Sequence, residues 1–388
     1  MTTQISNSFS LTIAAPSSAP SWAQNAIGAW TAIPNSILRD DAQGVKQTPD
    51  PLGTQNPPEG AMYWSGVVAA YDEPSIYYWG GGHGNYAGNE VYRLTLEESP
   101  TWSREIDASP SASVVVDTGY YTDGKPNPWH TYFNCLYDIN RRRLMFLSSE
   151  GWYGDGSHGD IYEAIAFDID AGLWLTGNNN GQSGTIRGGV QYIPTTGGTS
   201  GLPYASACSN PVTGDQYTIR MGSSGALIFK WSTSTQTWSS FGSLGTTNWN
   251  VRGVLAVDTT RGDVWGFLNG QAPLRVSSAG VLTRPTLTGA SASIFNASQL
   301  AAAHYVPALD SIVATLNAIN ADHSQIWVMN CATLACTQVS TTGTVTQTAF
   351  NNGNDGNLYK RFHYVPSLKG VFTIPYFDTP AFFCRLHD

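Results

Sequence analysis

The sequence predicts an all-β fold, a six-bladed β-propeller whose last blade is closed by a strand from near the N-terminus. Two observations predict it. The 388 residues include 40 Gly and 21 Pro and carry only 12% charged residues, a composition that favours short strands and tight turns over long amphipathic helices. In addition, a unit of four short strand candidates repeats along the chain, as in propeller blades.

The first unit is the clearest one. Its second strand candidate runs into three glycines, and the stretch from residue 78 to residue 92 reads YWGGGHGNYAGNEVY. A turn residue follows the first strand of each unit. Once inserted loops are allowed for, the spacing between these turn residues is close to the blade period of ~40 to 50 residues. Two long intervals coincide with residues 109–128 and 177–201, which we interpret as insertions. The six turn residues are Asp72, Asp138, Asn210, Asp258, Pro307 and Pro366.

The sixth unit contains only three strand candidates before the chain stops. Propellers commonly close when a strand from one terminus completes the blade at the other, and the isolated strand candidate around Trp30 fits the vacant place. We therefore expect an N-terminal arm or linker over residues 1–28 and a single propeller domain over residues 29–388. A seven-bladed ring and a β-sandwich are the alternatives.

Charge and hydropathy exclude two classes of partner. The net charge of −9 disfavours nucleic acid, because the overall field of the protein would repel it. No apolar run approaches the ~18 residues of a membrane span. The first 22 residues lack Lys and Arg and make a poor signal peptide. We expect an extracellular or virion-surface location. Either the sequence is a mature or recombinant form, or the protein leaves its cell by another route.

The sequence contains five cysteines, an odd number, so they cannot all form disulfides with one another. Cys331 and Cys336 flank a short turn and could form one disulfide across a hairpin, or could equally be two buried thiols. A zinc site is not expected, because no second cysteine pair or closely spaced histidine pair accompanies them. No cofactor is expected. The stretch around Asp155 and Asp160 is interpreted as a Gly/Asp turn, with a calcium loop as the less favoured interpretation.

The first unit resembles a kelch motif. Gly80 and Gly81 end its second strand, Tyr92 follows eleven residues after Gly81, and Trp102 follows ten residues later. The match is partial in the next two units and nearly lost afterwards. The resemblance implies a propeller similar to that of galactose oxidase, without a visible counterpart of its copper ligands. The low lysine content and the abundance of Ser, Thr, Asn and Gly also resemble bacteriophage tail or spike proteins.

Six of the seven histidines fall near one face of the predicted ring, the face where blades are joined and where second strands turn into third strands. Each histidine alone could equally satisfy buried carbonyl groups in a wet channel, but the set together favours a ligand-binding face. The six are His83, His158 and His323 in second-to-third loops and His130, His304 and His363 near the starts of first strands, whereas His387 lies elsewhere.

Aromatic and cationic side chains on this face suggest a sugar ligand. Aromatic rings stack on the apolar side of a sugar, and Arg or His engages its hydroxyl or carboxylate groups. Trp129 and Trp152 are expected to be exposed in loops, whereas Trp102, Trp174 and Trp238 are expected to pack between blades. The predicted ligand-binding set is His83, Asn85, Trp129, His130, Trp152, His158, Arg220, Arg252, His304, His323, Arg361 and His363.

The function that these observations favour is carbohydrate recognition, in a phage receptor-binding protein or another virion surface component. Whether the protein is an enzyme stays open. The first alternative is a polysaccharide lyase, with His83, His130, Tyr132 and Arg252 as candidates for the base and the uronate-neutralising cation. The second is a structural propeller that serves assembly, with a virion protein or another partner bound through the N-terminal arm.

Overall fold

The computed structural model describes the chain in segments. These are residues 19–38, 62, 64–81, 86–115, 120–147, 164–175, 186–187, 190–191, 206–222, 225–244, 253–297, 300–317, 322–345 and 357–388. Among them, no helix has both the length and the apolar character needed to cross a membrane.

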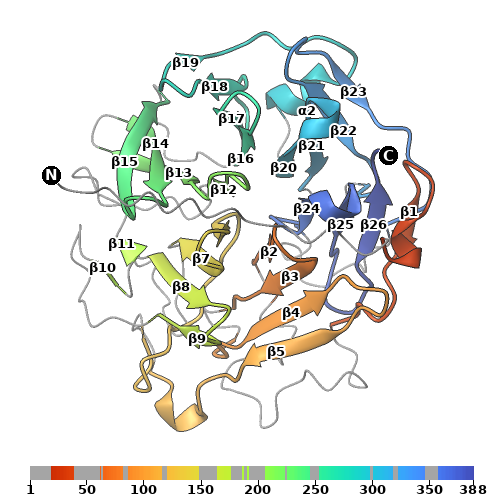
Figure 1. Cartoon of the computed structure of the whole chain (residues 1–388). Coiled ribbons are helices and arrows are strands. Elements are labelled where there is room, and N and C mark those ends of the chain that lie inside the picture. Colours follow the sequence, from red (N-terminus) through yellow and green to blue (C-terminus); the bar gives the residue numbers. More distant parts are fainter. Residues whose placement is uncertain are drawn as a thin grey trace, which may run out of the picture.

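The described segments form a ring of blades around a central axis (Figure 1). Within these segments there are six four-stranded antiparallel sheets and one two-stranded hairpin. The first strand of each sheet contacts the first strands of the two neighbouring sheets, all the way round the ring. The predicted six-bladed propeller is confirmed, and the seven-bladed ring and the β-sandwich are excluded.

The first three blades contain strands β2 to β9 and β12 to β15. The hairpin of β10 and β11 lies between blades two and three in the sequence, within the predicted second insertion. Blade one is β2 (Val67–Ala69), β3 (Ser75–Tyr78), β4 (Val91–Thr95) and β5 (Trp102–Ile106). Blade two is β6 (Cys135–Asp138), β7 (Arg143–Leu147), β8 (Ala164–Asp168) and β9 (Leu173–Trp174). Then follow β10 (Ile186–Arg187), β11 (Val190–Gln191), and blade three, β12 (Ala207–Ser209), β13 (Gln216–Gly222), β14 (Gly225–Ser232) and β15 (Thr237–Ser243).

The last three blades follow the same order from the axis outward. Blade four is β16 (Gly253–Asp258), β17 (Asp263–Leu268), β18 (Leu274–Val276) and β19 (Leu282–Thr283). Blade five is β20 (Leu300–Val306), β21 (Ser311–Leu316), β22 (Trp327–Asn330) and β23 (Cys336–Gln338). Blade six is β24 (Phe362–Val365), β25 (Gly370–Thr373), β26 (Phe382–Arg385) and β1 (Trp30–Ala32). Helical turns are η1 (Ser21–Ala23), η3 (Ser111–Ser113), α2 (Ala292–Ala297), η4 (Pro307–Leu309) and η5 (Pro366–Leu368).

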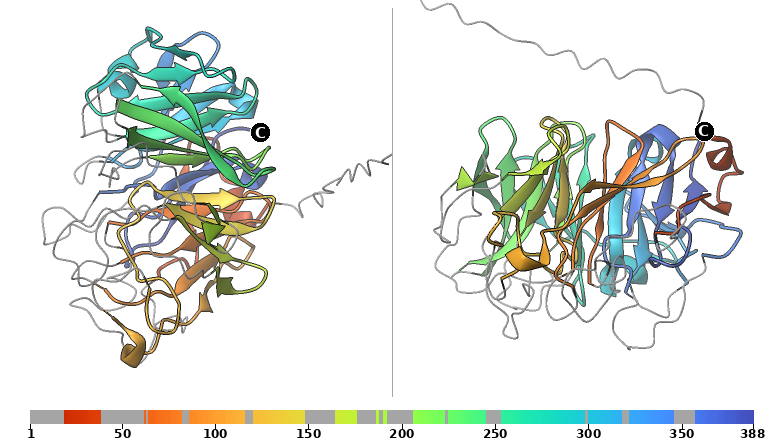
Figure 2. Two further views of the ribbon diagram at one scale, coloured as in Figure 1. Left: turned by 90° about the vertical axis from the view of Figure 1, so that its left-hand side faces the viewer. Right: turned by 90° about the horizontal axis from the view of Figure 1, so that it is seen from below.

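Burial explains the sequence pattern of the strands. Every residue of β16 and β17 is buried, whereas the outer strand β15 is mostly exposed or half-buried. An inner strand is covered on both sides by the neighbouring blades, so it is apolar without alternation. The turned views show the strands of each blade running between the two faces of the ring (Figure 2).

Ring closure follows the sequence prediction. β1 pairs antiparallel with β26, with Trp30 opposite Cys384 and Ala32 opposite Phe382. The Trp30 side chain is buried, and its indole Nε1 donates a hydrogen bond to the carbonyl of Ser324, 2.7 Å away in blade five. The N-terminal strand therefore completes blade six and also fastens it to its neighbour.

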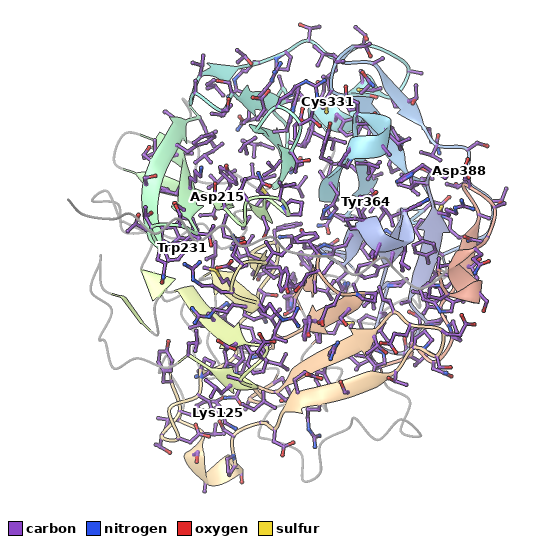
Figure 3. The ribbon with its side chains drawn as sticks, viewed as in Figure 1. Lys125, Asp215, Trp231, Cys331, Tyr364 and Asp388 are labelled. Atoms are coloured by element: carbon purple, nitrogen blue, oxygen red, sulfur yellow. The ribbon has the colours of Figure 1, made fainter. Side chains whose placement is uncertain are left out.

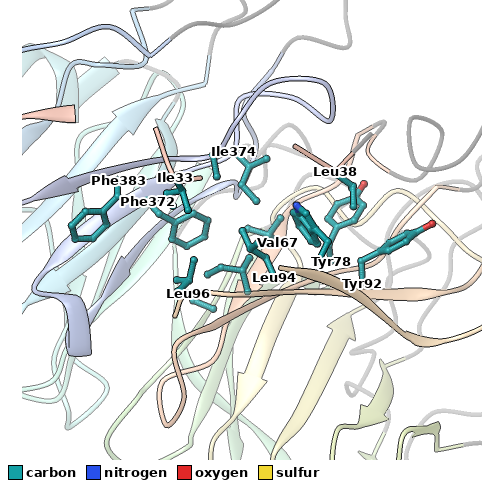
Figure 4. Packing of buried hydrophobic residues seen from close by; sticks show 14 of the residues in the cluster. Ile33, Leu38, Val67, Tyr78, Tyr92, Leu94, Leu96, Phe372, Ile374 and Phe383 are labelled. Atoms are coloured by element: carbon teal, nitrogen blue, oxygen red, sulfur yellow. The ribbon is translucent and has the colours of Figure 1, made fainter. Parts of the chain in front are cut away.

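Aromatic residues pack between blades where the sequence predicted them. Trp102 lies in a buried cluster that joins blade one to blade six, and Tyr92 belongs to the same cluster (Figure 4). Trp174 lies in the cluster between blades one and two, and Trp238 in the cluster between blades two and three. The predicted role of these three tryptophans in blade packing is confirmed.

The turns after the first strands form the second face of the ring, where acidic and basic side chains tie blades together. Arg261 of blade four makes a two-pronged ion pair with Asp310 of blade five, at 2.6 and 2.7 Å. Arg142 of blade two donates one hydrogen bond to Asp72 and another to Glu73, which are two separate carboxylates of blade one. Planar guanidinium groups suit such paired contacts with carboxylates.

We predict that replacing Trp30 weakens the closed ring. The Trp30→Ala variant should lower the free energy of unfolding by about 3 to 5 kcal/mol, because a large buried side chain is lost at the closing strand. Urea unfolding followed by circular dichroism measures this. The control, Val281→Ala, changes an exposed side chain and should stay within about 0.5 kcal/mol of the parent protein. Equal midpoints for the two variants would contradict the role of Trp30.

Candidate functional site

Several predicted site residues lie outside the described part of the chain. They are His83, Asn85, Trp152, His158 and Arg252, together with Asp155 and Asp160 of the candidate calcium loop. Arg220 lies in β13, but its side chain is not described. Their roles stay predictions.

The expected exposure of Trp129 is wrong. Its side chain is completely buried, in the cluster between blades one and two. Its ring packs edge-on against Trp79 with the centroids 5.1 Å apart, and Trp79 in turn packs on Phe146 and Trp174. The Gly and Pro residues near Trp129 mark a loop, but they do not show whether the side chain points outward or between the blades.

Four side chains gather on the face where the first strands begin, and we call them the aromatic group: Trp64, His130, Tyr132 and Tyr359. The Trp64 ring lies 5.8 Å from the His130 ring in a stacked arrangement, 6.0 Å from Tyr132 and 5.9 Å from Tyr359. The His130 Nδ1 atom and the Tyr132 hydroxyl form a hydrogen bond of 3.1 Å. Trp64 is half-buried and the other three are buried.

The same local backbone conformation places three of these rings. Trp64, Tyr132 and Tyr359 each stand three residues before the first strand of their blade, β2, β6 and β24. All three have positive φ, at 56°, 43° and 42°. Bulky residues rarely adopt this conformation, which costs of order 1 to 3 kcal/mol, and such strain concentrates at functional sites. Three blades thus turn an aromatic ring toward a common point.

His304 and His363 come together deeper in the ring, with centroids 4.7 Å apart. His304 is the fifth residue of β20, so it lies within the strand and not at its start. Its Nε2–H donates to the carbonyl of Phe362 at 2.9 Å, which joins blade five to blade six. The Nε2–H of His363 is shared between the carbonyls of Val67 and Lys360, at 2.9 and 3.0 Å, and joins blade six to blade one.

Burial fixes the charge of both imidazoles. It lowers the pKa of His304 to about 3 and holds the pKa of His363 well below its usual value. Both rings are therefore neutral at pH 7. Their contacts fit the structural alternative raised above, in which axial histidines satisfy backbone carbonyls, and their assignment as ligand-binding residues stays a prediction.

The remaining described candidates are also buried. Arg361 precedes β24, and its Nε donates to the carbonyl of Leu358 at 3.1 Å while its Nη2 donates to the carbonyl of Asn357. Burial lowers the pKa of this guanidinium, and the nearby tyrosines Tyr78, Tyr376 and Tyr359 oppose that shift. His323 lies in the loop between β21 and β22, as expected from the sequence, and is buried there.

All five cysteines lie in described segments, and all are free and buried. Cys331 and Cys336 are therefore two separate buried thiols in this structure. The disulfide, the other possibility that the sequence left open, is not formed. Burial raises the pKa of Cys331 to about 12 and that of Cys336 to about 11, so both stay protonated. Among the described residues, no group of three or more His, Cys, Asp or Glu side chains is placed to hold a metal ion.

Sequence reasoning did not single out Tyr359 and Lys360. A usable signal was present, because Tyr359 occupies the same position before β24 that Trp64 occupies before β2 and Tyr132 before β6. Lys360 follows directly and is buried, in a chain that has few lysines. Aligning the units on the starts of their first strands, instead of on the turns that end them, would have found Tyr359.

Comparison with known proteins supports the fold and goes no further. No protein-family model matches the chain, and a search of curated proteins gives no match either. Among solved structures, the chain is similar to a structural genomics protein of unknown function from Bacteroides thetaiotaomicron, with 9% identity, a TM-score of 0.50, and coverage of 91% of this chain and 74% of that one. It is also similar to an auxiliary nutrient binding protein from Bacteroides ovatus, with 9% identity, a TM-score of 0.50, and coverage of 91% and 75%. At this identity the likeness shows the propeller fold alone.

The buried histidines predict a pH dependence of stability. Their folded pKa values lie below the unfolded value of about 6.5, so between the two values the unfolded chain binds more protons. The stability is fully present above about pH 6.5 and falls as the pH drops toward the folded values. Urea unfolding at pH 7 and at pH 5 should show this loss, and His304→Gln and His363→Gln should each reduce it. Unchanged pH dependence in both variants would show that other groups cause the loss.

Proposed function

We propose that the protein is a carbohydrate-recognising β-propeller that engages a polysaccharide through the aromatic group. The observation that carries the proposal is the convergence of Trp64, Tyr132 and Tyr359 from three blades, each on a strained backbone and with His130 stacked on Trp64. Aromatic faces stack on the apolar C–H side of a sugar ring, and an imidazole can bond its hydroxyl groups. Trp64 is the half-buried member of the group and the natural stacking surface.

Two wider features accord with this function. The similar protein from Bacteroides ovatus is named as an auxiliary nutrient binding protein, so a propeller of this kind occurs in a protein named for binding. The composition, with few lysines and abundant Ser, Thr, Asn and Gly, supports placement on a virion or another extracellular surface. The glycine and aromatic pattern of blade one supports a kelch-like blade, with Gly81 at φ 123° where the chain turns beside Tyr86.

A glycan-binding experiment tests the proposal. A panel of neutral and uronate-containing polysaccharides is titrated into the protein, and Trp64→Ala should weaken the binding of the recognised glycan about tenfold, because a stacking surface is lost. The predicted cation Arg252 should also contribute, so Arg252→Ala should weaken binding to a uronate glycan. Leu173→Ala, at an exposed position on the outer strand of blade two, is the control and should bind as the parent does. Unchanged affinity in a folded Trp64→Ala variant would exclude the aromatic group as the site.

A second candidate function, polysaccharide β-elimination, is favoured by one specific contact. The His130 imidazole and the Tyr132 hydroxyl lie 3.1 Å apart, so one group could take the C5 proton of a uronate while the other protonates the leaving oxygen. Burial near the axis would keep water from the reacting atoms. The uronate carboxylate would still need a cation, for which Arg252 is the sequence-based candidate.

An absorbance assay separates the two functions. If the protein catalyses β-elimination, incubation with uronate-containing polysaccharides should raise the absorbance at about 235 nm, because the product carries a conjugated double bond. Tyr132→Phe should then abolish the signal while leaving glycan affinity within about threefold of the parent, since only a hydroxyl is removed. A glycan that binds without any absorbance change would leave recognition as the function and exclude the lyase for that substrate.

A further inference from the structure

A second binding feature lies along the axis of the ring. A cavity of about 400 Å³ is enclosed by the first strands of blades three to six and by residues of blades one and two, a volume within the range of small-molecule sites. At one end its lining includes Ser206 and Lys360, which precede first strands, and at the other it includes Val212, Pro307 and Pro366, which follow them. The latter three are exposed, so the mouth opens on the turn face, opposite the aromatic group.

Lys360 lines this cavity at the end away from the turn face. Only 8% of the residue is exposed, and its Nζ donates hydrogen bonds to the carbonyl of Ala207, at 2.7 Å, and to the carbonyl of Cys135. Gly66 makes room for it, because a Cβ there would lie 2.9 Å from the Lys360 Cβ. An ammonium group has three donors, and in the described part of the chain two of them have acceptors.

The ammonium lacks a carboxylate partner in the cavity. The described residues that line it include no Asp or Glu. Cys208 also lines it, but burial raises the pKa of this thiol to about 12, so the sulfur carries no charge at pH 7. His304 lines it as a neutral ring. A buried cation without an opposite charge is costly, and burial lowers the pKa of Lys360 accordingly.

The walls between the two ends are apolar. Val254, Ala256 and Ala303 contribute to them, from the first strands of blades four and five. Tyr364 of β24, labelled in Figure 3, lines the cavity as well, and its hydroxyl bonds His387 at 2.9 Å. A sugar would leave many hydroxyl groups without partners against such walls, which disfavours the ligand class proposed for the other face.

We propose that the axial cavity binds a small organic monocarboxylate with an apolar, ring-containing body. The carboxylate accepts a hydrogen bond from the third N–H of Lys360, and the apolar body of the ligand lies against Val254, Ala256 and Ala303. In its protonated form Lys360 has one further donor and one positive charge, which match a single carboxylate better than a phosphate, because a phosphate has more charge and more acceptor atoms. None of the four residues of the aromatic group lines this cavity, so the proposal does not depend on the glycan proposal.

Calorimetric titration of the intact protein with naphthoate and with its neutral alcohol analogue, naphthalenemethanol, tests the proposal. The two probes share one apolar body and differ in the charged group. Naphthoate should bind at least ten times more tightly than the alcohol. In Lys360→Met, which keeps an unbranched apolar side chain, this preference should disappear. Equal affinity of the parent protein for both probes, or no binding of either, would overturn the proposal.

A surface variant keeps the test valid even if Lys360→Met does not fold. Val212 is 72% exposed at the mouth, so Val212→Asp adds a repelling carboxylate without disturbing the core. It should weaken naphthoate binding severalfold and leave alcohol binding unchanged. The matched control is Val281→Asp, at a position that is 60% exposed in blade four and does not line the cavity. The same naphthoate affinity in both variants would show that the bound carboxylate does not lie in this cavity and would overturn the assignment.

Discussion

The pairing of β1 with β26 is the constraint on which the rest of the structure depends. It joins residues near the two ends of the described chain and turns five complete blades and one partial blade into a closed ring. Without β1, β26 would be an exposed edge strand next to blade one, and open edges recruit other chains. The contact between β2 and β24 completes the circle of first strands.

Once the ring is closed, its axis must accommodate polar backbone atoms that lie far from bulk water. Side chains of neighbouring blades supply their partners. His304 bonds a carbonyl of blade six, His363 bonds a carbonyl of blade one, and Lys360 reaches carbonyls of blades two and three. Buried carbonyls need such partners, and a cation or imidazole that reaches from the next blade provides them. The groups that could serve a ligand are therefore largely the groups that hold the blades together.

The blade register could be predicted from the sequence because its signals are local. Asp138 and Asp258 end first strands, Pro307 and Pro366 begin the turns after them, and the missing strand of the sixth unit pointed to Trp30. The site was harder to predict. Lys360 and its partner Cys135 are 225 residues apart, and no local pattern shows which residues from different blades meet at the axis. Trp129 was misplaced for a related reason, since loop composition does not show the direction of a side chain.

The closing strand also has a consequence for biosynthesis. β1 leaves the ribosome before any other strand of its blade, and its partner β26 (Phe382–Arg385) is the last strand of the described residues. The earlier blades can pair internally as they are made, but the circle stays open until β26 has been made. Pairing over such a separation requires a long loop to close and slows folding. A nascent chain that stalls late would therefore carry an almost finished ring with its closing strand still unpaired, a natural target for chaperones and proteases.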